Sequence, residues 1–362
     1  MQTRRDFLTM GTALMGTALL SGPALTADRS TTWAGCRAHN GVYAATLFDG
    51  AGTILWDVVL PDRGHDVIAS PDGEMIVAVA RRPGTFAFVI DAATGEILYE
   101  IGAGPDRHFY GHGCFSPDGR LFYTTENDLL SNGGMIGVRD VRNGFSQVAS
   151  FPTGGIGPHE LAFLPDGKTL AVANGGLLTR PETGRTKLNI DTMSPSLALI
   201  DAGNGNILSE HRLPAAQHQL SIRHMSVGAP GITLALQYEG PKTDRMPLLA
   251  LFGGTTLRLA ETPTDLAREM RNYAGSIAHD RSGTIIAMSS PRGSLVSFWD
   301  AVEGTLLGSQ SAFDICGLAP GERAGEFIAT GGKDALIVSA DSLAPDATFA
   351  DTQWDNHLLR IA

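Results

Sequence analysis

Two short turn signatures recur along this chain, and their spacing constrains the fold more than any other feature. The first joins proline, aspartate and glycine, at Ser70-Pro71-Asp72-Gly73, Ser116-Pro117-Asp118-Gly119 and Leu164-Pro165-Asp166-Gly167. Proline presets φ for a turn, aspartate bonds to its own backbone, and glycine adopts positive φ. Weaker versions follow at Ala229-Pro230-Gly231, Arg281-Ser282-Gly283 and Ala319-Pro320-Gly321.

The second signature is an aspartate four residues before a glycine, at the end of an apolar run. It appears at Asp91 and Gly95, Asp140 and Gly144, Asp201 and Gly205, and Asp300 and Gly304. Short alternating segments, such as 74–80, 85–90 and 97–101, separate the turns and indicate strands. One unit is therefore four strands, and its length of about 40–60 residues is typical of a propeller blade.

Counting these units predicts an all-β fold, a seven-bladed β-propeller of four-stranded blades, with six or eight blades as the alternatives. Six full units begin near His65, His112, His159, Arg223, Ser276 and Asp314. Three strands at 31–38, 42–48 and 54–60 precede them, and a single strand at 356–361 ends the chain. Pairing the C-terminal strand with the N-terminal blade would close the ring and remove the exposed sheet edges. A further short helix is predicted at 263–271.

The N-terminus has the pattern of an export signal. Arg4 and Arg5 precede a weakly apolar run at 8–20 and small residues up to Ala27. This indicates a twin-arginine signal peptide over 1–27, a propeller domain over 28–362, and a periplasmic location. A membrane anchor is the alternative, but the run is short and rich in Gly and Thr.

Cys36, Cys114 and Cys316 show no paired spacing, so we expect three buried thiols.

Composition excludes some classes of function. With 27 Lys and Arg against 38 Asp and Glu, the chain lacks the basic character of a nucleic-acid-binding protein. No second long apolar run follows the export signal, so we expect no membrane span in the mature chain. The sequence also has no haem-attachment Cys-x-x-Cys-His, no Gly-x-Ser-x-Gly elbow and no phosphate-binding glycine loop. Enzyme chemistry therefore has no direct support.

Topology indicates which face carries function. Both turn signatures lie on one face of the disc, whereas the longer connections, at 81–84, 126–134, 174–196, 239–247 and 290–293, lie on the other. Loops on a rigid scaffold are where sites are usually built.

The innermost strands begin on the face with the longer connections, and the candidate ligand-binding residues there are His65, His112, His159, Glu160, Arg223, His224, Tyr273, Arg292 and His357. Neutral imidazoles with a carboxylate bind transition metals, so the candidate metal ligands are His112, His159, His224 and Glu126. For any one of these histidines the alternative is a structural role, holding strands in register.

Several segments resemble one bacterial family. They are Thr124-Thr125-Glu126-Asn127-Asp128, Gly155-Ile156-Gly157-Pro158-His159-Glu160-Leu161, Ala173-Asn174-Gly175-Gly176, Lys187-Leu188-Asn189-Ile190-Asp191-Thr192-Met193, His218-Gln219-Leu220-Ser221-Ile222-Arg223-His224, Arg271-Asn272-Tyr273 and Ser290-Pro291-Arg292-Gly293. The chain is similar to the uncharacterised, twin-arginine-exported family known as domain of unknown function 1513. That resemblance implies a propeller of the lactonase and quinoprotein type. It also implies a genomic context of imelysin-like iron-uptake and di-haem oxidoreductase-like proteins.

These observations lead to two hypotheses. The first is a periplasmic binding or accessory protein, linked to iron or haem acquisition, that uses the loop-rich face at the channel mouth. Iron, copper and haem are the candidate cofactors, and the imelysin-like or di-haem oxidoreductase-like proteins are the candidate partners. The alternative is a metal- or cofactor-dependent propeller enzyme, either a lactonase-like hydrolase or an oxidoreductase.

Overall fold

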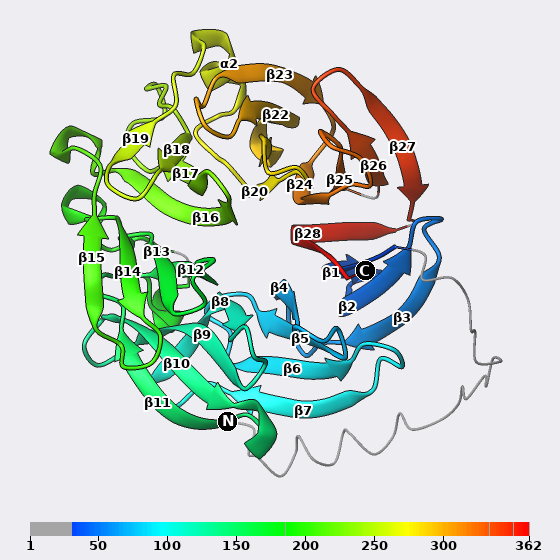
Figure 1. Cartoon of the computed structure of the whole chain (residues 1–362), viewed down its shortest axis with the longest axis vertical. Coiled ribbons are helices and arrows are strands. Elements are labelled where there is room, and N and C mark those ends of the chain that lie inside the picture. Colours follow the sequence, from blue (N-terminus) through cyan, green and yellow to red (C-terminus); the bar gives the residue numbers. More distant parts are fainter. Residues whose placement is uncertain (1–30, 185, 333, 350, 362) are drawn as a thin grey trace. The chain divides into compact units, whose positions relative to one another are not determined.

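Seven four-stranded antiparallel sheets are arranged in a ring around a central axis, as the repeat count predicts (Figure 1). The computed structural model describes residues 31–184, 186–332, 334–349 and 351–361. The seven-bladed prediction is confirmed, and the six- and eight-bladed alternatives are wrong. The signal peptide predicted for 1–27 lies outside the described residues.

Each sheet runs from an innermost strand at the channel to an outermost strand at the rim. The innermost strands are β28 (Thr352–Arg360), β4 (Gly64–Ala69), β8 (Arg107–Phe115), β12 (Pro158–Phe163), β16 (Leu220–Gly228), β20 (Ser276–His279) and β24 (Ile315–Pro320). The second strands are β1 (Thr32–His39), β5 (Met75–Ala80), β9 (Leu121–Asp128), β13 (Thr169–Asn174), β17 (Gly231–Tyr238), β21 (Ile285–Ser290) and β25 (Phe327–Gly331). The third strands are β2 (Val42–Asp49), β6 (Phe86–Asp91), β10 (Gly134–Asp140), β14 (Ser196–Asp201), β18 (Leu249–Phe252), β22 (Leu295–Asp300) and β26 (Asp334–Val338). The outermost strands are β3 (Ile54–Val59), β7 (Ile97–Gly102), β11 (Ser146–Pro152), β15 (Ile207–His211), β19 (Leu257–Leu259), β23 (Leu306–Ser311) and β27 (Leu343–Thr348).

Helical segments are short and lie in the connections. The predicted helix at 263–271 is confirmed as α2 (Thr264–Glu269). In the described ranges there are also five single turns of 3₁₀-helix: η1 (Val141–Asn143), η2 (Pro181–Thr183), η3 (Ile190–Thr192), η4 (Ala215–Gln217) and η5 (Pro291–Gly293). Among the described residues, no helix has the length and apolar character needed to cross a membrane.

The C-terminal strand closes the ring. β28 pairs antiparallel with β1, so the last strand of the chain becomes the innermost strand of the first blade. β28 also contacts β4 on one side and β24 on the other, which joins the first and last blades (Figure 1). The strand begins at Thr352, earlier than the predicted Asn356, and this earlier start brings Asp355 into the channel wall.

The recurrent turns form as their sequences predict. In the first signature, Ser70 Oγ donates to Asp72 Oδ1 at 2.5 Å, and Gly73 has φ of +73°. In the second, Asp91 Oδ1 accepts from the backbone N–H groups of Ala93 and Thr94 at 3.0 and 2.8 Å. Aspartate fixes both turns on one face, which leaves the longer connections on the other.

The hydrophobic core lies between the blades. Trp56 and Val58 of the first blade pack in one buried cluster with Ile76 and Phe88 of the second, and similar clusters join the other neighbours. Each blade therefore buries both faces, and the channel side is left to polar residues. The three cysteines are free thiols, two of them buried and Cys114 partly so.

Candidate functional site

Five neighbouring blades each place a histidine where the pairing of their innermost strand is irregular. The register shifts between Gly64 and Asp66 around His65, and between Pro158 and Glu160 around His159. Similar shifts occur beside His112, His224 and His357. A β-bulge redirects the side chain of the extra residue, so the break in pairing aims His65 and His159 at the channel, whereas in β16 the extra residue is Arg223 and His224 directly follows it.

The five rings form one compact group, which we call the histidine cluster: His65, His112, His159, His224 and His357. Their ring centroids lie 4.5–6.2 Å apart in the pairs that make contact. One nitrogen from each of His65, His112 and His159 lies within 4.8 Å of the others, and the same holds for His112, His224 and His357. All five histidines among the predicted ligand-binding residues are therefore brought together.

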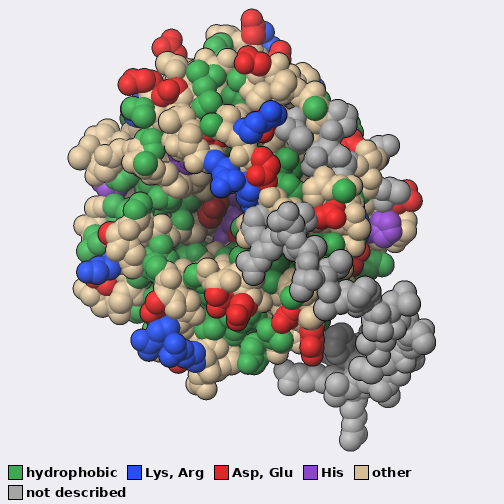
Figure 2. Space-filling model, turned by 45° about the vertical axis from the view of Figure 1, so that its right-hand side comes forward, with side chains coloured by type: hydrophobic (Ala, Val, Ile, Leu, Met, Phe, Trp, Pro, Cys, Tyr) green, Lys and Arg blue, Asp and Glu red, His purple; other side chains and the backbone are tan. Residues whose placement is uncertain are grey.

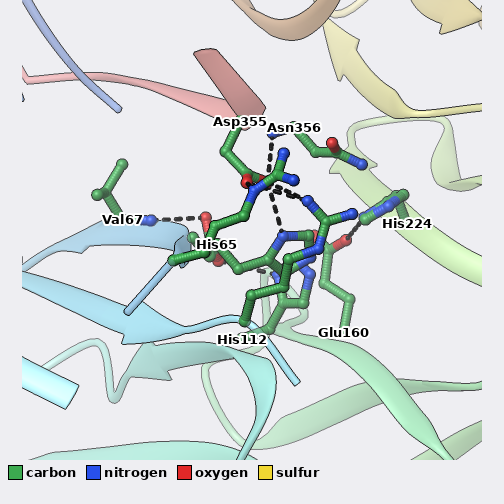
Figure 3. A network of polar contacts seen from close by, with 10 residues as sticks. His65, Val67, His112, Glu160, His224, Asp355 and Asn356 are labelled. Atoms are coloured by element: carbon green, nitrogen blue, oxygen red, sulfur yellow. Dashed lines mark hydrogen bonds and ion pairs between the residues drawn. The ribbon is translucent and has the colours of Figure 1, made fainter. Parts of the chain in front are cut away.

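Three carboxylates orient the cluster, and each joins one blade to the next. His65 Nδ1 contacts Asp355 Oδ1 at 3.1 Å, and His112 Nδ1 contacts Asp66 Oδ2 at 2.9 Å. His224 Nδ1 contacts Glu160 Oε2 at 3.2 Å (Figure 3). In each pair the acid lies on the innermost strand of one blade and the histidine on the innermost strand of the next blade along the chain. The three contacts therefore run in the same direction around the ring. A carboxylate on one ring nitrogen fixes the tautomer and orients the other nitrogen, as at many metal sites.

Four other nitrogens of the cluster have no hydrogen-bond partner in the part of the chain that the structure describes. Among the described residues, Nε2 of His112, His224 and His357 and Nδ1 of His159 are buried without a hydrogen bond. Since buried polar atoms are nearly always satisfied, four such nitrogens within one group of contacting rings call for an explanation. A metal ion bound among the rings would give them partners.

Burial keeps most of the cluster neutral. It lowers the pKa of His65, His159 and His224 well below the ordinary value, and that of His357 to about 4. Burial also acts on His112, but the carboxylates of Asp66 and Glu160 outweigh it and raise the pKa of that ring. Only a deprotonated imidazole nitrogen can bind a metal, so four of the rings are ready to do so at neutral pH.

The acids respond differently to their surroundings. Burial raises the pKa of Glu160 to about 7. Burial would also raise the pKa of Asp355. The contacts with His65, Arg81 and Arg63 outweigh this effect and hold the pKa of that carboxyl well below its usual range. Asp355 therefore stays charged while it positions His65.

The size of the cluster fits an ion and does not fit a haem. Metal–imidazole bonds of about 2.0–2.1 Å place the nitrogens around one ion about 3–4 Å apart, which is compatible with ligand atoms that lie within 4.8 Å of one another in each group. His112 belongs to both groups of three, so the two groups overlap at its ring. Five rings at such short separations leave no lateral room between them for a porphyrin.

The channel mouth lies beside the cluster and is lined by three further predicted residues, Arg223, Tyr273 and Arg292. They border a cavity of about 470 Å³, whose wall also includes Asn356, the neighbour of His357. The guanidinium of Arg292 stacks on the Tyr273 ring at 4.2 Å. The face in Figure 2 is hollowed near its centre, where basic, acidic and histidine side chains gather.

Glu126 belongs elsewhere. We expected it at the start of a long connection, but it lies inside β9, fully buried. It accepts from Arg139 at 2.8 Å and from Arg107 at 3.2 Å, and it is in neither group of cluster nitrogens. Its carboxylate is used within its own blade, and we place it outside the candidate metal site.

Sequence reasoning missed Asp66 and Asp355. The available indication was the repeated pair His65-Asp66 and His159-Glu160 at equivalent positions of two blades. The acid of each pair bonds to the histidine of the following blade, so no spacing within one blade could reveal its partner.

Fold and site together define a seven-bladed propeller with a buried histidine cluster in its channel. The sequence model of the family described as protein of unknown function (DUF1513) matches residues 58–361, and the chain belongs to this family. No curated protein matches the sequence.

Solved structures share the fold. A chain of Kuenenia stuttgartiensis hydrazine synthase is similar with a TM-score of 0.63 and 16% identity, over 82% of this chain and 91% of that one. The β-propeller domain of Myceliophteria thermophila Cps50 (Swd1) is similar with a TM-score of 0.55 and 12% identity, over 82% and 93% of the two chains. At these identities the likeness concerns the fold alone.

Proposed function

We propose that this protein is a periplasmic metal-binding propeller, exported by the twin-arginine route, that holds one transition-metal ion in the histidine cluster. The observation that carries the proposal is the set of four buried, unpartnered imidazole nitrogens in the histidine cluster, whose rings form two overlapping groups of potential ligands. Three carboxylate contacts that orient the neighbouring rings support it. The protein's part is to orient the rings, to keep most of them neutral and to shield them from water.

The donor set narrows the choice of ion. Imidazole suits zinc, copper, iron and nickel, whereas calcium and magnesium prefer oxygen. The genomic context that the family resemblance implies would favour iron, and the general affinity order favours copper. We propose a binding or accessory role in iron acquisition, with imelysin-like or di-haem oxidoreductase-like proteins as partners.

A metal titration tests this proposal. Metal-free protein would be titrated with Fe²⁺ without oxygen, and separately with Cu²⁺, in competition with a chromophoric chelator. We expect saturation at about one ion per chain, and nitrogen hyperfine structure in the copper electron paramagnetic resonance spectrum. His112→Ala should weaken binding most, because His112 belongs to both groups of nitrogens. His211→Ala, on the outer strand β15, is the matched control. Equal affinity in wild type and His112→Ala would overturn the proposal.

A second candidate function rests on the cavity at the channel mouth. A space of about 470 Å³ beside the cluster is large enough to admit a small substrate. A metal ion there could activate water for a lactonase-like hydrolysis or take part in an oxidation. If metal-loaded protein turned over lactones or oxidised small reductants, and His112→Ala did not, an enzymatic function would be favoured. If no lactone or reductant in a panel of such compounds were turned over, the binding role would remain.

A further inference from the structure

We propose that the channel mouth is a subsite for a small carboxylate-bearing anion, held by Arg223 and Arg292 beside the histidine cluster. The inference deepens the proposed function and rests on it, because it gives the chemical class of the ligand that accompanies the metal ion. The arginines can be tested without the metal, so the two proposals can fail separately.

Charge at the mouth is opposite to that of the whole protein. Five basic side chains (Arg63, Arg82, Lys187, Arg223 and Arg292) and two acidic ones (Glu239 and Asp314) line the cavity. The full chain carries a formal net charge of −11, so this concentration of cations is local. A concave site of one sign focuses its field and attracts ligands of the other.

Three of these cations already have partners. Arg63 pairs with Asp355, and Lys187 pairs with Glu239. Arg82 donates to Tyr110 Oη at 3.1 Å and to Thr179 Oγ1 at 3.0 Å. Their contacts shape the wall of the cavity and leave the recognition of an anion to the other two.

Arg223 is the anchor of the subsite. It is only 5% exposed, yet among the described residues its Nε and Nη1 have no hydrogen-bond partner. Burial lowers its pKa to about 10. A buried guanidinium with unsatisfied N–H groups is costly unless a ligand supplies the acceptors. Since it lines the cavity and precedes His224 in β16, an anion bound to it would lie next to the cluster.

Arg292 supplies the second contact. It is exposed, and its guanidinium stacks on Tyr273, which fixes the plane and leaves the edge free for hydrogen bonds. No ion pair engages it among the described residues. Arginine binds carboxylates through two parallel hydrogen bonds, and two arginines suit an anion with more than one carboxylate.

Citrate binding to metal-free protein, followed by isothermal titration calorimetry, tests the proposal. We expect wild type to bind citrate, and Arg223→Gln and Arg292→Gln each to weaken binding by about tenfold or more. Arg142→Gln removes the same charge from the exposed 3₁₀ turn η1 and should bind citrate like wild type. Thermal melting of each variant establishes that it is folded.

The outcomes separate the two proposals. Absence of citrate binding by wild type, or equal binding by wild type and both arginine variants, would overturn the anion subsite whatever the metal result. Phosphate binding as tightly as citrate would overturn the assignment to carboxylates. The protein could also bind citrate in a way that depends on the arginines and yet take up no metal. That result would support the anion subsite and overturn the proposed metal-binding function. Arg292→Gln keeps the test valid if Arg223→Gln fails to fold.

Discussion

Replacing Glu126 with glutamine should destabilise the fold without affecting metal binding. The carboxylate is fully buried and accepts from Arg139 at 2.8 Å, from Arg107 at 3.2 Å and from Thr124 at 2.9 Å. Arg139 is only 1% exposed, so Glu126→Gln would leave its charge buried without a counter-ion. Removing one partner of a buried pair costs about 3–5 kcal/mol.

That cost converts into a measurable change in melting temperature. At about 2.1 cal/mol/K per residue, the roughly 330 residues of the propeller give an unfolding entropy of about 0.7 kcal/mol/K. A loss of about 3–5 kcal/mol then lowers the melting temperature by about 4–7 °C. Differential scanning calorimetry would measure this decrease in melting temperature. The control is Glu96→Gln, which changes an exposed glutamate in the turn between β6 and β7.

Two results would refute this reasoning. A melting temperature within about 1 °C of wild type would mean that the pair with Arg139 contributes nothing measurable to the fold. Loss of metal binding in folded Glu126→Gln would mean that the carboxylate serves the metal after all. Adding Arg139→Met to Glu126→Gln should recover part of the stability, because the uncompensated charge is then gone.

Three further predictions concern the cluster, the turns and the closure of the ring. Asp66→Asn should weaken metal binding by about 10–100-fold in a chelator competition, because it removes the charge that orients His112. Asp280→Asn should lower stability at neutral pH, since hydrogen bonds from Ser282, Ile285 and Gly325 lower the pKa of Asp280 against the effect of burial. This stabilisation is present above the unfolded pKa and is lost as pH falls through the folded pKa, so urea unfolding of wild type and variant should converge in acid. Ending the chain at Asp351 should abolish cooperative thermal unfolding, because β28 is then missing.

Each of these has a clear contrary result. Unchanged metal affinity in Asp66→Asn would show that the carboxylate contact does not orient the ring. A stability difference between wild type and Asp280→Asn that persists in acid would mean that the charge of Asp280 is not responsible. A sharp melting transition in the truncated chain would show that six complete blades close without β28.

The sequence was sufficient to predict the blades because their turns are local. Ser70-Pro71-Asp72-Gly73 and its repeats specify tight turns through side chains within four residues, and the lone final strand indicated how the ring closes. Histidines at the strand starts could likewise be placed on one face.

The contacts that make the site were beyond such reasoning. Asp66 meets His112, and Asp355 meets His65, only because adjacent blades pack side by side. The bulges that aim the rings depend on how two strands pair, which no single strand encodes. Glu126 was misplaced for the same reason, since its arginine partners lie on β8 and β10.

Metal analysis of the natively exported protein, purified without chelators, tests the central claim most directly. Inductively coupled plasma mass spectrometry, with an optical spectrum of the same sample, would be compared for wild type, His112→Ala and His211→Ala. We predict about one transition-metal ion per chain in wild type and in His211→Ala, with little left in His112→Ala. Wild-type protein that holds no metal even after reconstitution, or equal metal in His112→Ala, would contradict the account.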